Sequence, residues 1–156
     1  MVVFGGWDGS VTLNDLNMFD LENHVWVAPQ GVTGEVKGRY RHSSSATTTS
    51  MFIFGGIDQQ QERFNDIQEY NFVTRTWSRV VTIGTPPTSR TFHQSNVCNG
   101  VLFVMGGFDG MKRNDMYRIV VDQAVAQRQQ IPVETDDRHH TQVEKANEAS
   151  VATKQP

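Results

Sequence analysis

The chain has 156 residues, with 14 lysines and arginines against 17 aspartates and glutamates, which gives a formal net charge of -3. This length allows one domain and a short appendage, and the lack of a positive excess disfavours binding to nucleic acid or to an anionic membrane. The single cysteine, Cys98, excludes an internal disulfide, and no apolar run approaches the roughly 20 residues that cross a bilayer. We therefore expect a cytoplasmic protein that binds neither nucleic acid nor membrane.

Three copies of one sequence unit follow one another before residue 122. Each copy carries a glycine doublet, an aspartate two residues later and then an Asn-Asp pair, and the doublets are 50 and 51 residues apart. The doublets are Gly5-Gly6, Gly55-Gly56 and Gly106-Gly107, and the aspartates after them are Asp8, Asp58 and Asp109. The aspartates of the Asn-Asp pairs are Asp15, Asp66 and Asp115. An internal repeat of this period indicates a solenoid, a propeller or a similar array.

Within each copy the local pattern predicts β-strands. Residues 51–54 and 101–105 are short runs of β-branched and aromatic residues that end at glycines. Asn99-Gly100 is the dipeptide best suited to a two-residue hairpin turn between strands at 92–97 and 101–105. Each complete copy accounts for about four antiparallel strands, which is the content of one propeller blade.

These residues resemble the kelch repeat, a β-propeller family. The resemblance implies an all-β fold of four-stranded antiparallel blades over residues 1–121: a partial blade at 1–27, a full blade at 39–80 and a partial blade at 90–121. Propellers close with about 4–8 blades. We therefore expect an incomplete ring of about two and a half blades, completed by further kelch blades of a longer protein or by other chains.

The repeated motif residues are expected to be structural first. Paired glycines let neighbouring blades approach closely, and a tryptophan is a large apolar plug for the gap between two blades. The Asn-Asp pairs are expected to bond their own loop backbone. The residues with this expected role are Gly5, Gly6, Asp15, Trp26, Gly55, Gly56, Asp66, Trp77, Gly106, Gly107 and Asp115.

Two sets of loops are candidates for binding other proteins, because loops on a rigid scaffold concentrate function. One set follows the glycine doublets and the other precedes the first strand of each blade. The candidate residues are Trp7, Asp8, Arg39, Tyr40, Arg41, Asp58, Arg90, Phe92, Phe108 and Asp109. Arg39, Arg41 and Arg90 would favour an acidic peptide. Alternatively, Arg39 and Arg90 bond blade carbonyls, and Trp7 and Phe108 simply pack.

No constellation of residues predicts catalysis or a cofactor. His42 and His93 repeat in register, each three residues after an arginine, and a metal site built on them would lack a third ligand. His139-His140 is an isolated doublet. The resemblance implies a non-catalytic protein-interaction module, of the kind found in ubiquitin-ligase adaptors and cytoskeletal scaffolds. The alternatives are a structural subunit of a larger assembly and a metal-dependent enzyme built on a propeller.

The remaining segment, residues 122–156, differs in composition from the repeats. It has no glycine and no aromatic residue and is rich in glutamine and glutamate. Such a segment has too little apolar surface to offset its ordering entropy, so we expect a disordered or loosely helical tail.

Overall fold

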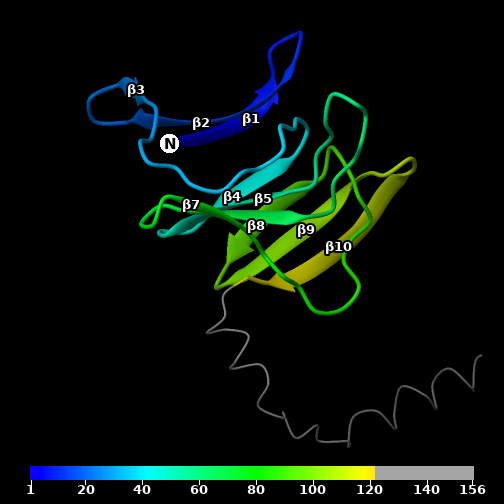
Figure 1. Ribbon diagram of the computed structural model, residues 1–156. Helices are drawn as coiled ribbons and strands as arrows, with labels where there is room; N and C mark the ends of the chain where they lie inside the picture. The colour runs from blue at the N-terminus through cyan, green and yellow to red at the C-terminus, as the bar shows by residue number, and fades with distance from the viewer. Residues whose placement is uncertain (122–156) are drawn as a thin grey trace, which may run out of the picture. The chain divides into compact units, whose positions relative to one another are not determined.

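The computed structural model describes residues 1–121, which form ten β-strands in three antiparallel sheets (Figure 1). Sheet 1 consists of β1 (Val2–Trp7), β2 (Thr12–Asp20) and β3 (Val25–Val27). Sheet 2 consists of β4 (Ser43–Ala46), β5 (Ser50–Phe54), β6 (Ile67–Asn71) and β7 (Thr76–Arg79). Sheet 3 consists of β8 (Gln94–Cys98), β9 (Val101–Phe108) and β10 (Lys112–Val120).

The prediction of an all-β fold built from propeller-type blades is confirmed. In sheet 2 the four strands pair in chain order, as a meander of consecutive hairpins. Across residues 1–121 there is no helix that could span a membrane. The expected tail at 122–156 lies outside the described residues.

Strand β5 is buried on both faces, and this explains why its sequence is a continuous apolar run. Met51 and Ile53 belong to a cluster with Phe4 of sheet 1, whereas Phe52 and Phe54 belong to a second cluster with Leu102 and Val104 of sheet 3. Sheet 2 therefore separates two apolar layers, one shared with sheet 1 and one shared with sheet 3.

The hairpin turn between β8 and β9 is confirmed. Asn99 and Gly100 have φ angles of 49° and 73°, and Cys98 pairs with Val101 across the turn. Both turn residues thus adopt the left-handed conformation that favours the Asn-Gly dipeptide in two-residue hairpins.

The two repeated tryptophans lie in different environments. Trp77 is 7% exposed, with its ring centroid 4.9 Å from that of Phe4 in sheet 1, and so it fills the gap between two sheets as expected. Trp26 is 59% exposed, which corrects the expectation that it fills such a gap. Its ring centroid lies 5.0 Å from that of Phe19 in its own sheet, and Trp26 is not part of the apolar cluster between sheets 1 and 2.

Gly55 shows why a glycine doublet ends the second strand. Its φ of 63° is left-handed, and a Cβ atom there would lie 2.7 Å from the Arg90 carbonyl oxygen. We expect Gly55→Ala to lower the free energy of unfolding by about 2–3 kcal/mol, through backbone strain and this overlap. The matched control is Gly31→Ala, where φ is 69° and no atom lies within 4 Å, so strain alone costs about 1 kcal/mol. Equal losses in urea denaturation would contradict the role of close approach.

Candidate functional site

The loops that follow the glycine doublets meet the segments that precede the next sheet. Gly6 donates its amide to the Arg39 carbonyl at 2.9 Å, and Gly56 donates to the Arg90 carbonyl at 2.9 Å. These contacts bring both sets of candidate loops to the same end of the sheets. We call the partly or fully exposed aromatic and arginine side chains at this end the loop surface. Its members are Trp7, Tyr40, Arg41, Arg63, Phe92 and Phe108.

A chain of aromatic and guanidinium contacts runs across the loop surface. The rings of Trp7 and Tyr40 have centroids 5.6 Å apart. The Arg41 guanidinium carbon lies 4.9 Å from the Tyr40 ring centroid and 4.6 Å from that of Phe92, both within the range of cation–π attraction. Three sheets thus contribute to one surface, because Trp7 ends β1, Arg41 precedes β4 and Phe92 precedes β8.

Arg41 and Phe92 occupy equivalent positions and share an unusual backbone conformation. Their φ angles are 57° and 58°, in the left-handed region that bulky residues rarely adopt, and the Phe92 amide donates to the Arg41 carbonyl at 3.3 Å. Both residues are exposed, Phe92 by 62%. Strained conformations of exposed side chains concentrate at binding sites, where the surrounding structure holds them.

A second guanidinium contact lies on the same surface. The Arg63 guanidinium carbon lies 5.3 Å from the ring centroid of Phe108, whose backbone pairs with Thr91 beside Phe92. Within residues 1–121 neither Arg41 nor Arg63 forms an ion pair with a carboxylate. The two guanidiniums therefore keep their charge available for an anionic group.

The structure corrects the candidate role of Arg39 and Arg90, which are 1% and 0% exposed and cannot reach a partner. Arg39 donates from Nη1 to the Gly55 carbonyl at 3.0 Å and to Asp66 at 2.6 Å. Arg90 donates likewise to the Gly106 carbonyl at 2.9 Å and to Asp115 at 2.6 Å. The alternative interpretation, in which both arginines bond blade carbonyls, is the one that the structure shows.

Asp66 and Asp115 therefore have a different role from the one expected for the Asn-Asp pairs. Each carboxylate accepts two hydrogen bonds from a buried arginine, and Asp66 accepts a third from the Gln68 side chain at 2.6 Å. Asp15 is exposed and accepts a hydrogen bond from the Asn17 side chain at 2.6 Å. Within residues 1–121, Asp15 forms no ion pair with an arginine.

The three aspartates that follow the glycine doublets stabilise their own loops. Asp8 accepts hydrogen bonds from the amides of Ser10 and Val11, which lower the pKa of its carboxyl group. Asp109 is held by Arg113, whose hydrogen bond lowers the pKa of the carboxyl group.

Asp58 does not reach the surface. It is 1% exposed, forms an ion pair with Lys37 and accepts the Glu62 amide at 2.8 Å. Burial raises the pKa of the Asp58 carboxyl, but the contacts with Lys37 and Glu62 outweigh it and leave the pKa below its ordinary value. The expected binding role of Asp58 is therefore corrected to a structural one.

The two histidines in register lie between sheets. His93 is 3% exposed, and its Nε2 atom lies 3.0 Å from the Phe54 carbonyl oxygen. Burial lowers the pKa of both His42 and His93 to about 4, and the nearby Arg39 and Arg90 charges act in the same direction. Within the described part of the chain, no three His, Cys, Asp or Glu side chains are grouped so as to hold a metal ion. His139-His140 lies outside the described residues.

Sequence reasoning missed Arg63 and Lys37, because neither repeats in register. Lys37 pairs with Asp58 and Glu62, and so it neutralises the loop after the second glycine doublet. The available sequence signal for Arg63 is its position in the loop that follows the Gly55-Gly56 doublet.

Comparison with known proteins places the chain among repeat proteins. The sequence model of the KLHDC2/KLHL20/DRC7 Kelch-repeats domain matches residues 1–149. Kelch domain-containing protein 3 of Homo sapiens is 36% identical over 110 residues, covering 69% of this chain and 28% of that protein. Rab9 effector protein with kelch motifs of Bos taurus is 38% identical over 109 residues, covering 67% of this chain and 28% of that protein.

A longer relative shows a similar match. Leucine-zipper-like transcriptional regulator 1 homolog of Drosophila melanogaster is 32% identical over 126 residues, covering 76% of this chain and 13% of that protein. The chain thus spans less than a third of the length of each of these relatives.

Proposed function

The chain belongs to the kelch-repeat family, and on that premise we propose that it is a non-catalytic protein-interaction module that binds partners at the loop surface. The observation that carries this proposal is the stack of Arg41 between Tyr40 and Phe92, held outward by left-handed backbone at Arg41 and Phe92. Arginine and large aromatic side chains are the residue types that anchor protein interfaces.

The partner that this surface favours is an acidic segment of another protein. Arg41 and Arg63 supply two guanidiniums that carboxylates would pair with in a bidentate manner, while Trp7, Phe92 and Phe108 supply apolar contact area. Two of the neighbouring acidic groups, Asp58 and Asp109, already pair with Lys37 and Arg113 and so oppose such a ligand less.

Two biological settings suit such a module. In one, the loop surface recognises a substrate for a larger complex or holds a scaffold together, and one relative is by name a Rab9 effector protein. In the other, the chain is a structural subunit whose propeller is completed by other chains. The exposed Trp26 favours further sheets beside sheet 1 in either setting.

Binding of an acidic peptide should depend on the stacked arginine. We expect Arg41→Glu combined with Phe92→Ala to weaken binding of a glutamate-rich decapeptide at least about 10-fold, since an interface hot spot is worth 2 kcal/mol or more. The measurement is fluorescence anisotropy with the labelled peptide, alongside a glutamine-for-glutamate version that should bind wild-type chain weakly.

The matched control is Arg79→Glu, which makes the same charge change on β7 at a residue that is not a member of the loop surface. It should leave peptide affinity within about 2-fold. Equal affinity of the double variant and wild type, with the β-sheet circular dichroism of both intact, would contradict the proposal. Equal weakening by Arg79→Glu would show a general charge effect instead of a site.

A further inference from the structure

The outer edge of sheet 3 is open in the described part of the chain. Sheet 3 has the strand order β10-β9-β8, so β10 pairs with β9 on one side only. Counted as in a complete four-stranded blade, β10 is a third strand, and its equivalents are β2 in sheet 1 and β6 in sheet 2. Each of these pairs with a fourth strand, β2 with β3 and β6 with β7. An unpaired edge strand presents free amides and carbonyls to which another extended segment can bind.

The fourth strand carries a tryptophan in both sheets that have this strand. In sheet 1 Trp26 pairs with Phe19, and in sheet 2 Trp77 pairs with Tyr70. Trp77 points from that pair into the layer between sheets 1 and 2, where it contacts Phe4. In sheet 2 the fourth strand thus places one large aromatic side chain between neighbouring sheets, whereas Trp26 of sheet 1 remains exposed.

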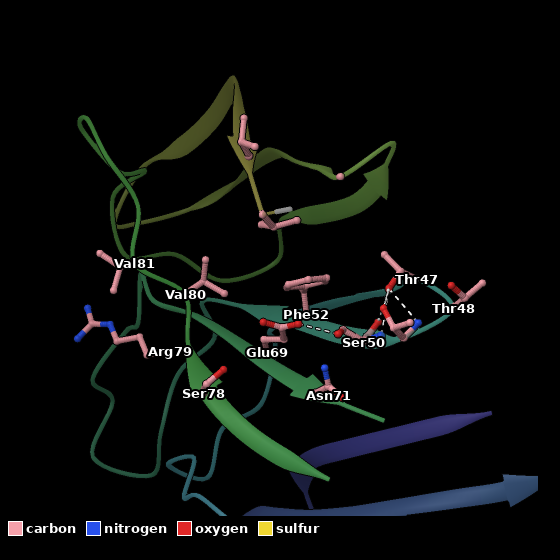
Figure 2. Close-up of a pocket in the computed structure, with 14 residues that line it drawn as sticks. Thr47, Thr48, Ser50, Phe52, Glu69, Asn71, Ser78, Arg79, Val80 and Val81 are labelled. Carbon is pink, nitrogen blue, oxygen red and sulfur yellow. Dashed lines mark hydrogen bonds between the residues drawn. The ribbon is translucent and has the colours of Figure 1, made fainter. Parts of the chain in front are cut away.

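A pocket lies beside the end of β10, where the corresponding aromatic side chain of sheet 3 would point. Its volume is about 730 Å³, and Figure 2 shows Phe52, Glu69, Ser78 and Val80 among the side chains that line it. Val120 and Val121 line it at the end of β10. In the register of the repeats, Phe52 and Glu69 correspond to Val2 and Met18, which pack against the cluster that holds Trp77.

The sequence that follows β10 has no tryptophan at the position where the other two copies carry one. Phe19 and Tyr70 each precede their tryptophan by seven residues, and the residue seven positions after the equivalent Ile119 is Ala126. No residue after Tyr117 is aromatic. The pocket therefore suits an aromatic side chain that residues 118–156 do not supply.

We propose that the edge of β10 binds an extended segment of a partner protein, which adds as a fourth strand and inserts one aromatic side chain opposite Ile119. The residue after that aromatic would lie beside Arg118, on the face of sheet 3 that points away from sheet 2. Arg118 is exposed and forms no ion pair among residues 1–121. The expected ligand is therefore an extended segment in which an acidic residue directly follows the aromatic residue. This site is separate from the loop surface and does not depend on it.

The probe is a labelled peptide that copies residues 74–81, Thr-Arg-Thr-Trp-Ser-Arg-Val-Val, with the full-length chain as receptor. We expect saturable binding in fluorescence anisotropy, at least about 10-fold weaker when alanine replaces the tryptophan. A peptide with aspartate in place of the serine should bind several-fold more tightly, and Arg118→Glu should abolish that gain.

Filling the pocket should block the peptide. Ser78 is exposed and pairs with Glu69 on the face that lines the pocket, so Ser78→Trp fills it from sheet 2 and should weaken binding about 10-fold. Ser44→Trp is the matched control, because Ser44 is exposed on β4 outside the pocket, and it should leave affinity unchanged.

Hydrogen exchange gives the location of the bound peptide independently. The peptide should slow exchange of β10 amides in the wild-type chain and leave the residues of the loop surface unaffected. No binding, binding that ignores the tryptophan or Ser78→Trp, or protection only at the loop surface would each overturn the proposal. So would β10 amides that are already protected in the free chain, because residues 122–156 would then be the strand that pairs there.

Discussion

Replacing Asp66 with alanine is expected to lower the free energy of unfolding by about 3–5 kcal/mol, the cost of leaving one partner of a buried ion pair without the other. The Arg39 side chain is 2% exposed and that of Asp66 15%, and two hydrogen bonds of 2.6 and 3.1 Å join them. Without the carboxylate, the guanidinium would remain in the interior with only two backbone carbonyls as acceptors.

The position of this ion pair explains the size of the effect. Arg39 immediately precedes sheet 2, its own carbonyl accepts the Gly6 amide of sheet 1, and its Nη1 atom donates to the Gly55 carbonyl at the end of β5. Burial raises the pKa of the Asp66 carboxyl, but Arg39 outweighs this and keeps the pKa below its ordinary value. The carboxylate is therefore ionised at neutral pH and neutralises a charge at the junction of two sheets.

The repeat supplies matched controls for the Asp66 substitution. Asp15→Ala removes the equivalent aspartate from a sheet that has no arginine partner and should cost less than about 0.5 kcal/mol. Asp115→Ala should fall between the two, because the Asp115 side chain is 34% exposed and water can reach the site. Urea denaturation monitored by circular dichroism measures all three.

A double substitution separates the lost attraction from the isolated charge. Arg39→Met combined with Asp66→Ala should recover part of the stability that Asp66→Ala loses, since no unpaired charge then remains buried. Equal losses for Asp15→Ala and Asp66→Ala, or no recovery in the double variant, would contradict the assigned role of the ion pair.

The sheets were predictable because their signals are local. The β-branched and aromatic runs that end at glycine doublets, and the Asn99-Gly100 turn, depend on neighbours in sequence. Because the same pattern recurs in each copy, the strands expected in one copy could also be predicted in the others. Burial of both faces of β5 follows from the same pattern, because a continuous apolar run needs a neighbouring sheet on each side.

The candidate site was only partly predictable, because exposure depends on the neighbouring sheet. Arg39 and Arg41 are two residues apart in one short motif, yet Arg39 is buried and Arg41 is exposed. Nothing in the sequence marks the left-handed backbone that directs Arg41 outward, since arginine rarely adopts it. Trp26 and Trp77 show the same limit, because identical motif positions differ in whether a sheet covers them.

Acidification should destabilise the chain before its carboxylates titrate. His42 and His93 have a pKa of about 4 in the folded chain, against an ordinary value of 6.5. The unfolded chain therefore binds more protons than the folded chain between pH 6.5 and pH 4, and stability falls as the pH falls through this window. Each histidine should contribute a loss of about 3 kcal/mol, complete below pH 4.

The physical cause is the interior of the sheet junctions. Burial is the largest cause of the lowered pKa of both histidines. Protonation would also place a second positive charge near Arg39 or Arg90. The Nδ1 atom of each ring is buried and has no hydrogen-bond partner among the described residues. Backbone carbonyls near the rings raise the pKa of both histidines, but burial outweighs them. The paired aspartates, Asp66 and Asp115, have lowered pKa values and lose their contribution only at pH values below those at which the histidines charge.

Urea denaturation at a series of pH values tests this prediction. His93→Gln should remove about half of the decline between pH 6.5 and pH 4, and the double variant with His42→Gln should remove most of it. His24→Gln is the matched control, because that ring is exposed, and it should leave the slope unchanged. A decline that persists in the double variant would mean that other groups take up protons in this window. The sheet junctions would then not be the part of the chain that limits its stability in acid.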